Sequence, residues 1–244
     1  APDTLILEEE PFIGNAEVML GGVEGLATAS AEQLTAAREQ YFEQVGSVGA
    51  LGPETVVIDK HPLHLNKVPT IRRLFPDAQF ILALRHPCDV LLSCFITNFR
   101  TNPGMSNFLT LDSAAELYDL TFASWTKAQA LYGLPVHTVV YERLVADKNR
   151  ELQPLFDALG LPWPGADFDH RIVARERGVV STASYAQVTE PIYTRSSGRW
   201  RRYEQHLESV IAQVRPWIER FGYAVEDDRV PQWPSDVRSS EGVV

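Results

Sequence analysis

The pattern of apolar and polar positions predicts strands and helices in alternation. Gln79–Leu84 is apolar at nearly every position, which is typical of a strand buried on both faces. His86-Pro87 ends this run, and Cys88–Asn98 then has apolar residues at helical spacing, with Pro87 suited to the first helical position. Further strands are expected at Thr55–Asp59 and Val136–Tyr141, and further helices at Ala31–Val45, Pro69–Leu74, Asp112–Tyr132, Asp147–Leu159 and His206–Phe221. This alternation indicates an α/β fold, a three-layer sandwich around a mostly parallel sheet.

The ends of these elements and the stretches between them suggest a domain organisation. Ser113 and Glu116 have the spacing of a capping box at the start of a long helix. Pro162–Trp200 shows weak periodicity, and connections of that length in compact domains are often functional. From Glu226 onward the chain is polar and contains proline. We therefore expect one domain over residues 1–225 and a polar C-terminal tail over residues 226–244.

Composition excludes some classes of function. A chain of 244 residues can bury one sizeable core, and its net charge of −10 argues against a nucleic-acid binder. A small anionic ligand remains compatible, because such a site needs only local basic residues. Cys88 and Cys94 are too far round one helix to form a disulfide, which favours a reducing, cytoplasmic compartment. No apolar run reaches membrane-spanning length, and the chain begins Ala-Pro-Asp without an initiator methionine, as a fragment would.

Two cations follow predicted strands. Arg85 comes directly after the Gln79–Leu84 strand and before a helix, and Lys60 follows Thr55–Asp59 in the same way. Ligands of α/β sheets bind at the carboxyl ends of the strands, and anions bind at helix N-termini. Each residue could instead be an ordinary surface cation that pairs with a neighbouring loop. His61 and His64 have helix-surface spacing, but no third ligand is evident, so we predict no metal site.

Two further stretches have a composition that suits chemistry. In LILEEEPFIG, a glutamate could serve as a general base in a cleft, although an acidic run is more often a solvated turn. YTRSSGRWRRY, residues Tyr193–Tyr203, contains four arginines and no acid. Arginine with serine hydroxyls and a flexible glycine suits a phosphate, and the aromatic rings could stack on a base.

Taken together, these stretches resemble one family, the sulfotransferases. The resemblance is to the tyrosylprotein sulfotransferases and to the bacterial sulfotransferase domains that follow tetratricopeptide repeats, and it extends from the amino end to about Phe221. Its most specific part is Val56–Phe95, where DKHP, RLFPDAQFILALRHP and Ser93 reproduce the family's order and spacing. The resemblance implies a fold like that of P-loop NTPases and an enzyme that uses 3′-phosphoadenosine 5′-phosphosulfate (PAPS). Such an enzyme moves the sulfuryl group of PAPS to an acceptor hydroxyl and needs no metal.

The resemblance also assigns roles to individual residues. It implies Glu9 as the general base, with Glu8 as the alternative because a run of glutamates leaves the register open. Lys60 and Ser184 match groups near the transferred sulfuryl group. The residues that match the donor-binding positions are Arg85 and Ser93 for the 3′-phosphate, then Tyr141, Arg195, Gly198, Arg199 and Trp200.

One part of the family pattern is absent from this sequence. Members have a phosphate-binding loop, roughly Arg-Ser-Gly-Thr-Thr, upstream of the glutamate, and no such stretch occurs here. We therefore expect the chain to lack the first strand of the fold, and to be inactive alone without that N-terminal loop.

Two other classes of function remain as alternatives. One is a P-loop-like nucleotide kinase, in which Asp59 could bind magnesium; the other is a non-catalytic interaction module that has lost its donor loop. For the sulfotransferase, the acceptor could be a protein tyrosine, a sugar or a small molecule. No nucleic-acid or membrane partner is expected, and tetratricopeptide repeats could precede the domain in the complete protein.

Overall fold

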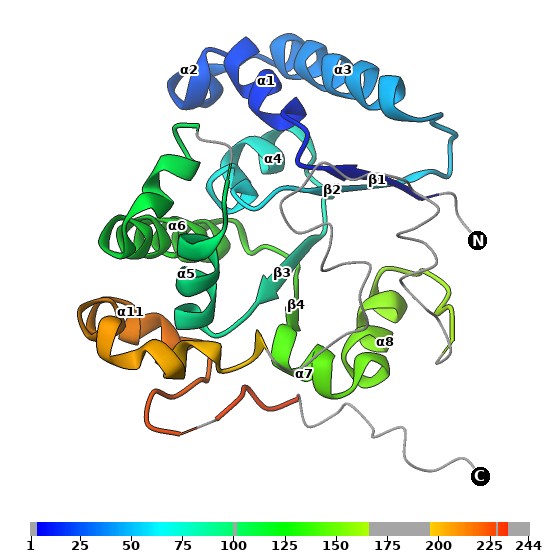
Figure 1. The fold of residues 1–244 in the computed structure, drawn as a ribbon. Coiled ribbons are helices and arrows are strands. Elements are labelled where there is room, and N and C mark those ends of the chain that lie inside the picture. Colours follow the sequence, from blue (N-terminus) through cyan, green and yellow to red (C-terminus); the bar gives the residue numbers. More distant parts are fainter. Residues whose placement is uncertain (1–3, 100–101, 166–195, 228, 234–244) are drawn as a thin grey trace. The chain divides into compact units, whose positions relative to one another are not determined.

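The computed structural model describes residues 4–99, 102–165, 196–227 and 229–233 (Figure 1). The chain divides into two compact units. Unit 1 comprises Ala1–Phe80 and Thr121–Pro135, and unit 2 comprises Ile81–Leu120 and Val136–Val244. Among the described residues, no helix combines the length and the apolar character that crossing a membrane requires.

Unit 1 contains a parallel pair of strands with helices on one side. Its elements are β1 (Thr4–Glu8), α1 (Phe12–Met19), α2 (Gly22–Thr28), α3 (Ala31–Val48), β2 (Val56–Lys60), η1 (His64–Asn66) and α4 (Val68–Leu74). β1 and β2 pair in parallel, from Thr4 opposite Val56 to Glu8 opposite Lys60. Helices α1, α2 and α3 lie together on one side of this pair (Figure 1). Because both strands run the same way, Glu8 and Lys60 end at the same edge of the sheet.

Two clusters of buried side chains form the core of unit 1. They consist of Leu7, Phe12, Ile13, Tyr41 and Val45, and of Ala16, Leu20, Leu26, Ala37 and Leu74. Helix α3 contributes Ala37, Tyr41 and Val45, which lie four residues apart on one face. Full burial of a leucine or valine stabilises the fold by about 1.5–3 kcal/mol. Gly25 permits the close approach between α2 and the preceding turn, because a Cβ there would lie 1.9 Å from the carbonyl oxygen of Leu20.

Unit 2 contains the second pair of strands and most of the remaining helices. Its elements are β3 (Phe80–Leu84), α5 (Pro87–Ile96), η2 (Met105–Leu109), β4 (Val136–Val140), α7 (Tyr141–Ala146), α8 (Lys148–Ala158), η4 (Arg199–His206) and α11 (Glu208–Arg220). The long helix α6 (Leu111–Tyr132) begins in unit 2 and ends in unit 1. β3 pairs with β4, and α5 packs beside α11 (Figure 1).

The α/β class is confirmed, with a preponderance of helix and small sheets in the described residues. Helix α5 begins at Pro87, and the His86 ring caps it by accepting a hydrogen bond from the Cys88 N–H. Both cysteines are free, as expected. Within the described residues the strands form two sheets of two, and the expected absence of a first strand stays a prediction.

Three details of the sequence interpretation differ from the structure. The start of α6 is capped by Thr110, whose Oγ1 accepts from the Ser113 N–H at 3.2 Å, so the capping box at Ser113 was wrong. Thr110 is the capping residue because the helix begins at Leu111, one residue before the start that the pattern suggested. Tyr141 is the first residue of α7 rather than the last of β4. β1, α1 and α2 were not predicted.

The division into residues 1–225 and 226–244 stays a prediction. The part of the tail that the structure describes contacts α7 and α8. Arg143 donates to the Gln232 carbonyl oxygen at 2.7 Å, and the Arg150 guanidinium lies 4.1 Å from the centre of the Trp233 ring.

Candidate functional site

The carboxyl ends of β1 and β2 bring Glu9 and Lys60 together. The Glu9 N–H donates to the Lys60 carbonyl oxygen at 2.8 Å, which extends the strand pairing by one residue. The Lys60 Nζ lies 2.9 Å from Glu9 Oε1, and the two side chains are 48% and 39% exposed. A carboxylate and an ammonium group are thus paired at the edge of a parallel sheet, where solutes can reach both.

The backbone of Glu9 is in an unusual conformation. Its φ of 62° is the one positive value at a non-glycine position among the described residues. The next residue, Glu10, precedes Pro11 and is therefore restricted to extended conformations, so the sharp turn into α1 falls on Glu9. The left-handed conformation costs a residue with a side chain about 1–2 kcal/mol. Strain of this kind persists where the surrounding structure fixes it, and it is frequent at functional sites.

Asp59, the residue before Lys60 in β2, has a side chain that is 14% exposed. Asp59 Oδ2 accepts a hydrogen bond from the Tyr41 hydroxyl at 3.0 Å, whereas Asp59 Oδ1 is buried without a hydrogen-bond partner in the described residues. His64 Nδ1 lies 3.9 Å from Oδ1. Burial raises the pKa of Asp59 to about 6 despite the Tyr41 hydrogen bond, with a further contribution from Glu10. Burial also lowers the pKa of His64 to about 4, so at neutral pH its ring does not neutralise Asp59.

Asp59→Asn is expected to stabilise the protein at neutral pH. A carboxyl whose pKa rises from 3.8 to about 6 on folding favours the folded state only when protonated, so wild-type stability falls as the pH rises between these values. At about 1.4 kcal/mol per pKa unit, the neutral amide should raise the free energy of unfolding by ~1–3 kcal/mol above pH 7, and by little at pH 4. Denaturant unfolding at both pH values tests this, with exposed Asp77→Asn as the control. A variant less stable than wild type at pH 7.5 would contradict the assignment.

The corner between β3 and α5 forms a second group, in unit 2. Arg85 follows the last residue of β3, and its guanidinium lies 4.9 Å from the centre of the Tyr141 ring. Its Nη2 donates to the Ser196 carbonyl oxygen. Its Nε is buried and has no hydrogen-bond partner within the described parts of the chain. Ser93 lies half-buried further along α5.

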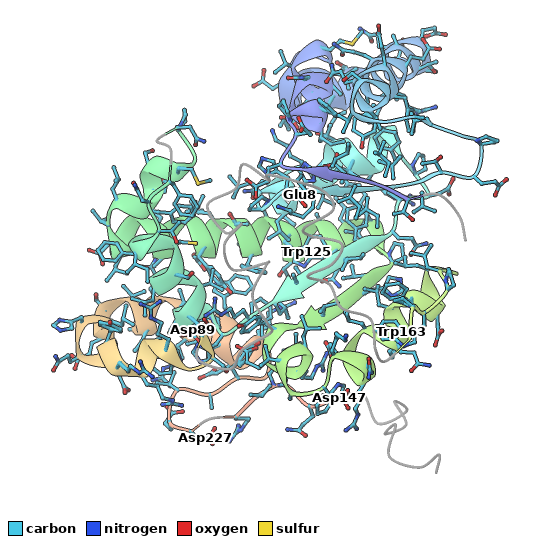
Figure 2. All side chains as sticks on the ribbon, turned by 45° about the vertical axis from the view of Figure 1, so that its right-hand side comes forward. Glu8, Asp89, Trp125, Asp147, Trp163 and Asp227 are labelled. Atoms are coloured by element: carbon cyan, nitrogen blue, oxygen red, sulfur yellow. The ribbon has the colours of Figure 1, made fainter. Side chains whose placement is uncertain are left out.

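The segment before η4 packs against this corner. Gly198 has a φ of 67° and precedes Arg199, the exposed first residue of η4. Trp200 is 1% exposed, and its ring stacks on the His86 ring with centroids 4.9 Å apart. The backbone N–H groups of Gly198 and Trp200 donate to the two carboxylate oxygens of Asp89, at 2.7 and 2.9 Å. Figure 2 labels Asp89 on α5.

The structure thus brings the expected residues together in two groups. Unit 1 contains Glu9 and Lys60, and unit 2 contains Arg85, Tyr141, Gly198 and Trp200, with Ser93 and Arg199 on the adjoining helices. Ser184 and Arg195 lie outside the described residues. In the described ranges, no cluster of three or more His, Cys, Asp or Glu side chains could hold a metal ion.

Sequence reasoning missed two acidic residues. Asp89 was not singled out, although an aspartate in the first turn of a helix that follows a buried strand is a recognisable signal. Asp59 was considered only as a magnesium ligand, and its hydrogen bond to Tyr41 links residues 18 positions apart, which no local pattern reveals.

Comparison with known proteins places the chain in a family. A model described as the sulfotransferase family matches residues 22–165, more than half of the chain. An uncharacterised protein of Aquifex aeolicus is 26% identical over 205 residues, which cover 84% of this chain and 26% of that protein. Protein-tyrosine sulfotransferase 1 of Danio rerio is 26% identical over 186 residues, and protein-tyrosine sulfotransferase 2 of Gallus gallus is 24% identical over 187. These matches cover 70% of this chain and 49% and 47% of those proteins, so the chain spans about a quarter to a half of the relatives' lengths. The chain belongs to the sulfotransferase family.

Proposed function

We propose that this chain contributes the donor 3′-phosphate site and the general base of a sulfotransferase that uses PAPS. The sulfuryl group would pass to an acceptor hydroxyl, with protein tyrosine as the first candidate because two relatives are named protein-tyrosine sulfotransferases. We further propose a cytoplasmic enzyme, in which a segment upstream of Ala1 supplies the phosphate-binding loop. Tetratricopeptide repeats could precede that segment.

The observation that carries the proposal is the state of Arg85. A buried guanidinium N–H without a partner is costly, and it costs less once an anion accepts from it. Arg85 lies at the carboxyl end of β3 and directly before α5, where the positive end of the helix dipole also favours an anion. Tyr141 covers one face of the guanidinium and fixes its plane. A phosphate oxygen would accept from this Nε–H group and balance the charge of the guanidinium.

We propose roles for the remaining donor residues as well. We assign Ser93 to the same phosphate, and Gly198, Arg199 and Trp200, together with Arg195, to the segment that closes over the donor. The left-handed Gly198 and the positive charge of the exposed Arg199 support that assignment. We assign Tyr141 to the donor site as well, because its ring lies against Arg85.

The chemistry falls to the pair in unit 1. We assign Glu9 to take the proton from the acceptor hydroxyl. The oxygen of that hydroxyl forms a bond to the sulfur of the donor at the same time. The bond between sulfur and the bridging phosphate oxygen breaks in line, and the electron pair leaves with the phosphate. Lys60, together with Ser184 and the upstream loop, stabilises the charge that develops on that oxygen and on the sulfuryl oxygens. The 2.9 Å contact between Lys60 and Glu9 supports the assignment of both to one site.

A nucleotide kinase is the less favoured alternative. It requires an ionised acid at a strand end for magnesium, and Asp59 is the only candidate that the sequence offered. Asp59 instead accepts a hydrogen bond from Tyr41, and burial raises its pKa. Both properties suit a residue that is hydrogen-bonded within the protein better than a metal ligand. Neither the hydrogen bond nor the raised pKa of Asp59 favours the non-catalytic module.

Radiolabelled sulfuryl transfer tests the function. The complete natural protein is incubated with labelled PAPS and three acceptors: a tyrosine-containing peptide, a monosaccharide and a simple phenol. We expect label on at least one acceptor, with the peptide as the first candidate, and a strong reduction in Lys60→Ala. Transfer of phosphate from ATP to these acceptors without transfer from PAPS would overturn the proposal in favour of the kinase.

A further inference from the structure

Three side chains of the β3–α5 corner hold three successive points of one distant segment. We call residues 196–200 the closing segment. Arg85 donates to the carbonyl oxygen of Ser196, the Asp89 carboxylate accepts from the N–H groups of Gly198 and Trp200, and the His86 ring stacks on the Trp200 ring. The corner and the closing segment are separated by more than a hundred residues in sequence.

Asp89 makes the most specific of these contacts. It is 0% exposed, and each of its carboxylate oxygens accepts one backbone N–H of the closing segment. Burial raises the pKa of Asp89, whereas the two N–H groups and Arg85 oppose that rise. A buried carboxylate is tolerated only where such bonds satisfy it, so the N–H groups of Gly198 and Trp200 and the charge of Asp89 require each other.

The carboxylate does not itself suit contact with the donor. Both oxygens already accept hydrogen bonds, and a negative charge repels phosphate. Asp89 therefore acts on the donor through the backbone that it holds. The φ of 67° at Gly198 also shows that this backbone is bent into a conformation that favours glycine, so the segment needs fixed points on both sides of the bend.

We propose that Asp89 is a positioning residue that holds the closing segment against Arg85 and so preorganises the donor site, an inference that rests on the proposed function. A segment that is already ordered loses less conformational freedom when the ligand binds, and affinity rises accordingly. In this account, Arg85 performs two tasks: its Nη2 fixes Ser196, and its Nε remains available to the phosphate. Asp89 ensures that the segment stays in place while Arg85 binds the anion.

The test compares Asp89→Asn with wild type by two measurements on the complete natural protein. Calorimetric titration with adenosine 3′,5′-bisphosphate should show donor-site affinity about tenfold weaker, because asparagine presents an N–H group to one of the two backbone donors. At saturating PAPS, kcat should change less than about threefold, since Glu9 and Lys60 are untouched. Hydrogen exchange should accelerate at the amides of Gly198 and Trp200.

Two comparisons separate positioning from general loss of structure. Asp147→Asn is the matched control, because Asp147 caps α8 by accepting from the Arg150 N–H at 3.0 Å, away from the closing segment. It should leave bisphosphate affinity unchanged. Gly198→Ala strains the closing segment without a clash, since a Cβ there meets no atom within 4 Å, and it should weaken bisphosphate binding several-fold.

The outcomes decide between distinct failures. Faster exchange at Gly198 and Trp200 with wild-type affinity in both variants would overturn the positioning role and leave the proposed function intact. Unchanged exchange in Asp89→Asn would also overturn it, because the carboxylate would then not hold the segment. A wild-type protein that does not bind the bisphosphate would overturn the proposed function, and with it the donor role of Asp89, whatever the exchange shows.

Discussion

Glu9→Gln is expected to lower the rate of sulfuryl transfer by roughly 10²–10⁴-fold and to leave donor affinity nearly unchanged. Glutamine keeps the shape of the side chain and removes the proton acceptor, so the loss falls on the chemical step. Donor binding should hold or tighten slightly, because a negative charge leaves a site built for an anion. The measurements are the transfer rate from PAPS and the dissociation constant of adenosine 3′,5′-bisphosphate in the complete natural protein.

Glu8→Gln is the matched control for the register. Glu8 is the last residue of β1 and is paired in the strand register with Lys60, whereas the Glu9 side chain contacts the Lys60 ammonium. Figure 2 labels Glu8 at the end of β1. Loss of turnover in Glu8→Gln alone would move the base by one residue. Full turnover in both variants would show that this acidic run is a solvated turn and that the base lies elsewhere.

Arg85→Ala should weaken binding of adenosine 3′,5′-bisphosphate at least about tenfold. A guanidinium–phosphate bond in a partly desolvated site contributes about 1.5–3 kcal/mol, and about 1.4 kcal/mol corresponds to a factor of ten. The substitution also removes the bond to the Ser196 carbonyl oxygen, so the closing segment loses one of its fixed points. Both effects act in the same direction on affinity.

Arg202→Ala separates the local contact from the loss of a positive charge. Arg202 belongs to the same basic stretch but is exposed, and it has no role in the proposed site. Its replacement should change bisphosphate affinity less than about twofold at physiological salt. Equal effects of the two substitutions would mean that Arg85 acts only through the overall charge.

The sequence predicts the fold best where the apolar pattern is local and strong. The run Phe80–Leu84 and the helix from Pro87 were expected within one or two residues, because a continuous apolar run and a proline at the first helical position leave clear signals. The expectation that this strand is buried on both faces was wrong: Leu82 and Leu84 are buried, whereas Ile81 on the other face is 44% exposed. β1 was not predicted, because its apolar residues are followed directly by three glutamates and this polar run suggested a turn. α1 and α2 are short and are interrupted by Gly21 and Gly22, both with positive φ.

The candidate site was predicted from family resemblance more than from pattern. Glu9 and Lys60 were expected in one site, and the parallel pairing of β1 with β2 brings them together across 51 residues of sequence. The supporting acids could not be found in this way. Asp59 and Asp89 owe their importance to burial and to partners that only the folded chain provides. The roles of all the site residues stay predictions until they are tested.

Arg85 and its neighbours are proposed to recognise the 3′-phosphate of the donor. The most direct measurement is a calorimetric comparison of adenosine 3′,5′-bisphosphate with adenosine 5′-phosphate and ATP, in wild type and in Arg85→Ala. We predict that wild type binds the bisphosphate at least about tenfold more tightly than either other nucleotide, and that Arg85→Ala loses most of this preference. Equal binding of the bisphosphate and adenosine 5′-phosphate by wild type, or tighter binding of ATP, would contradict the account.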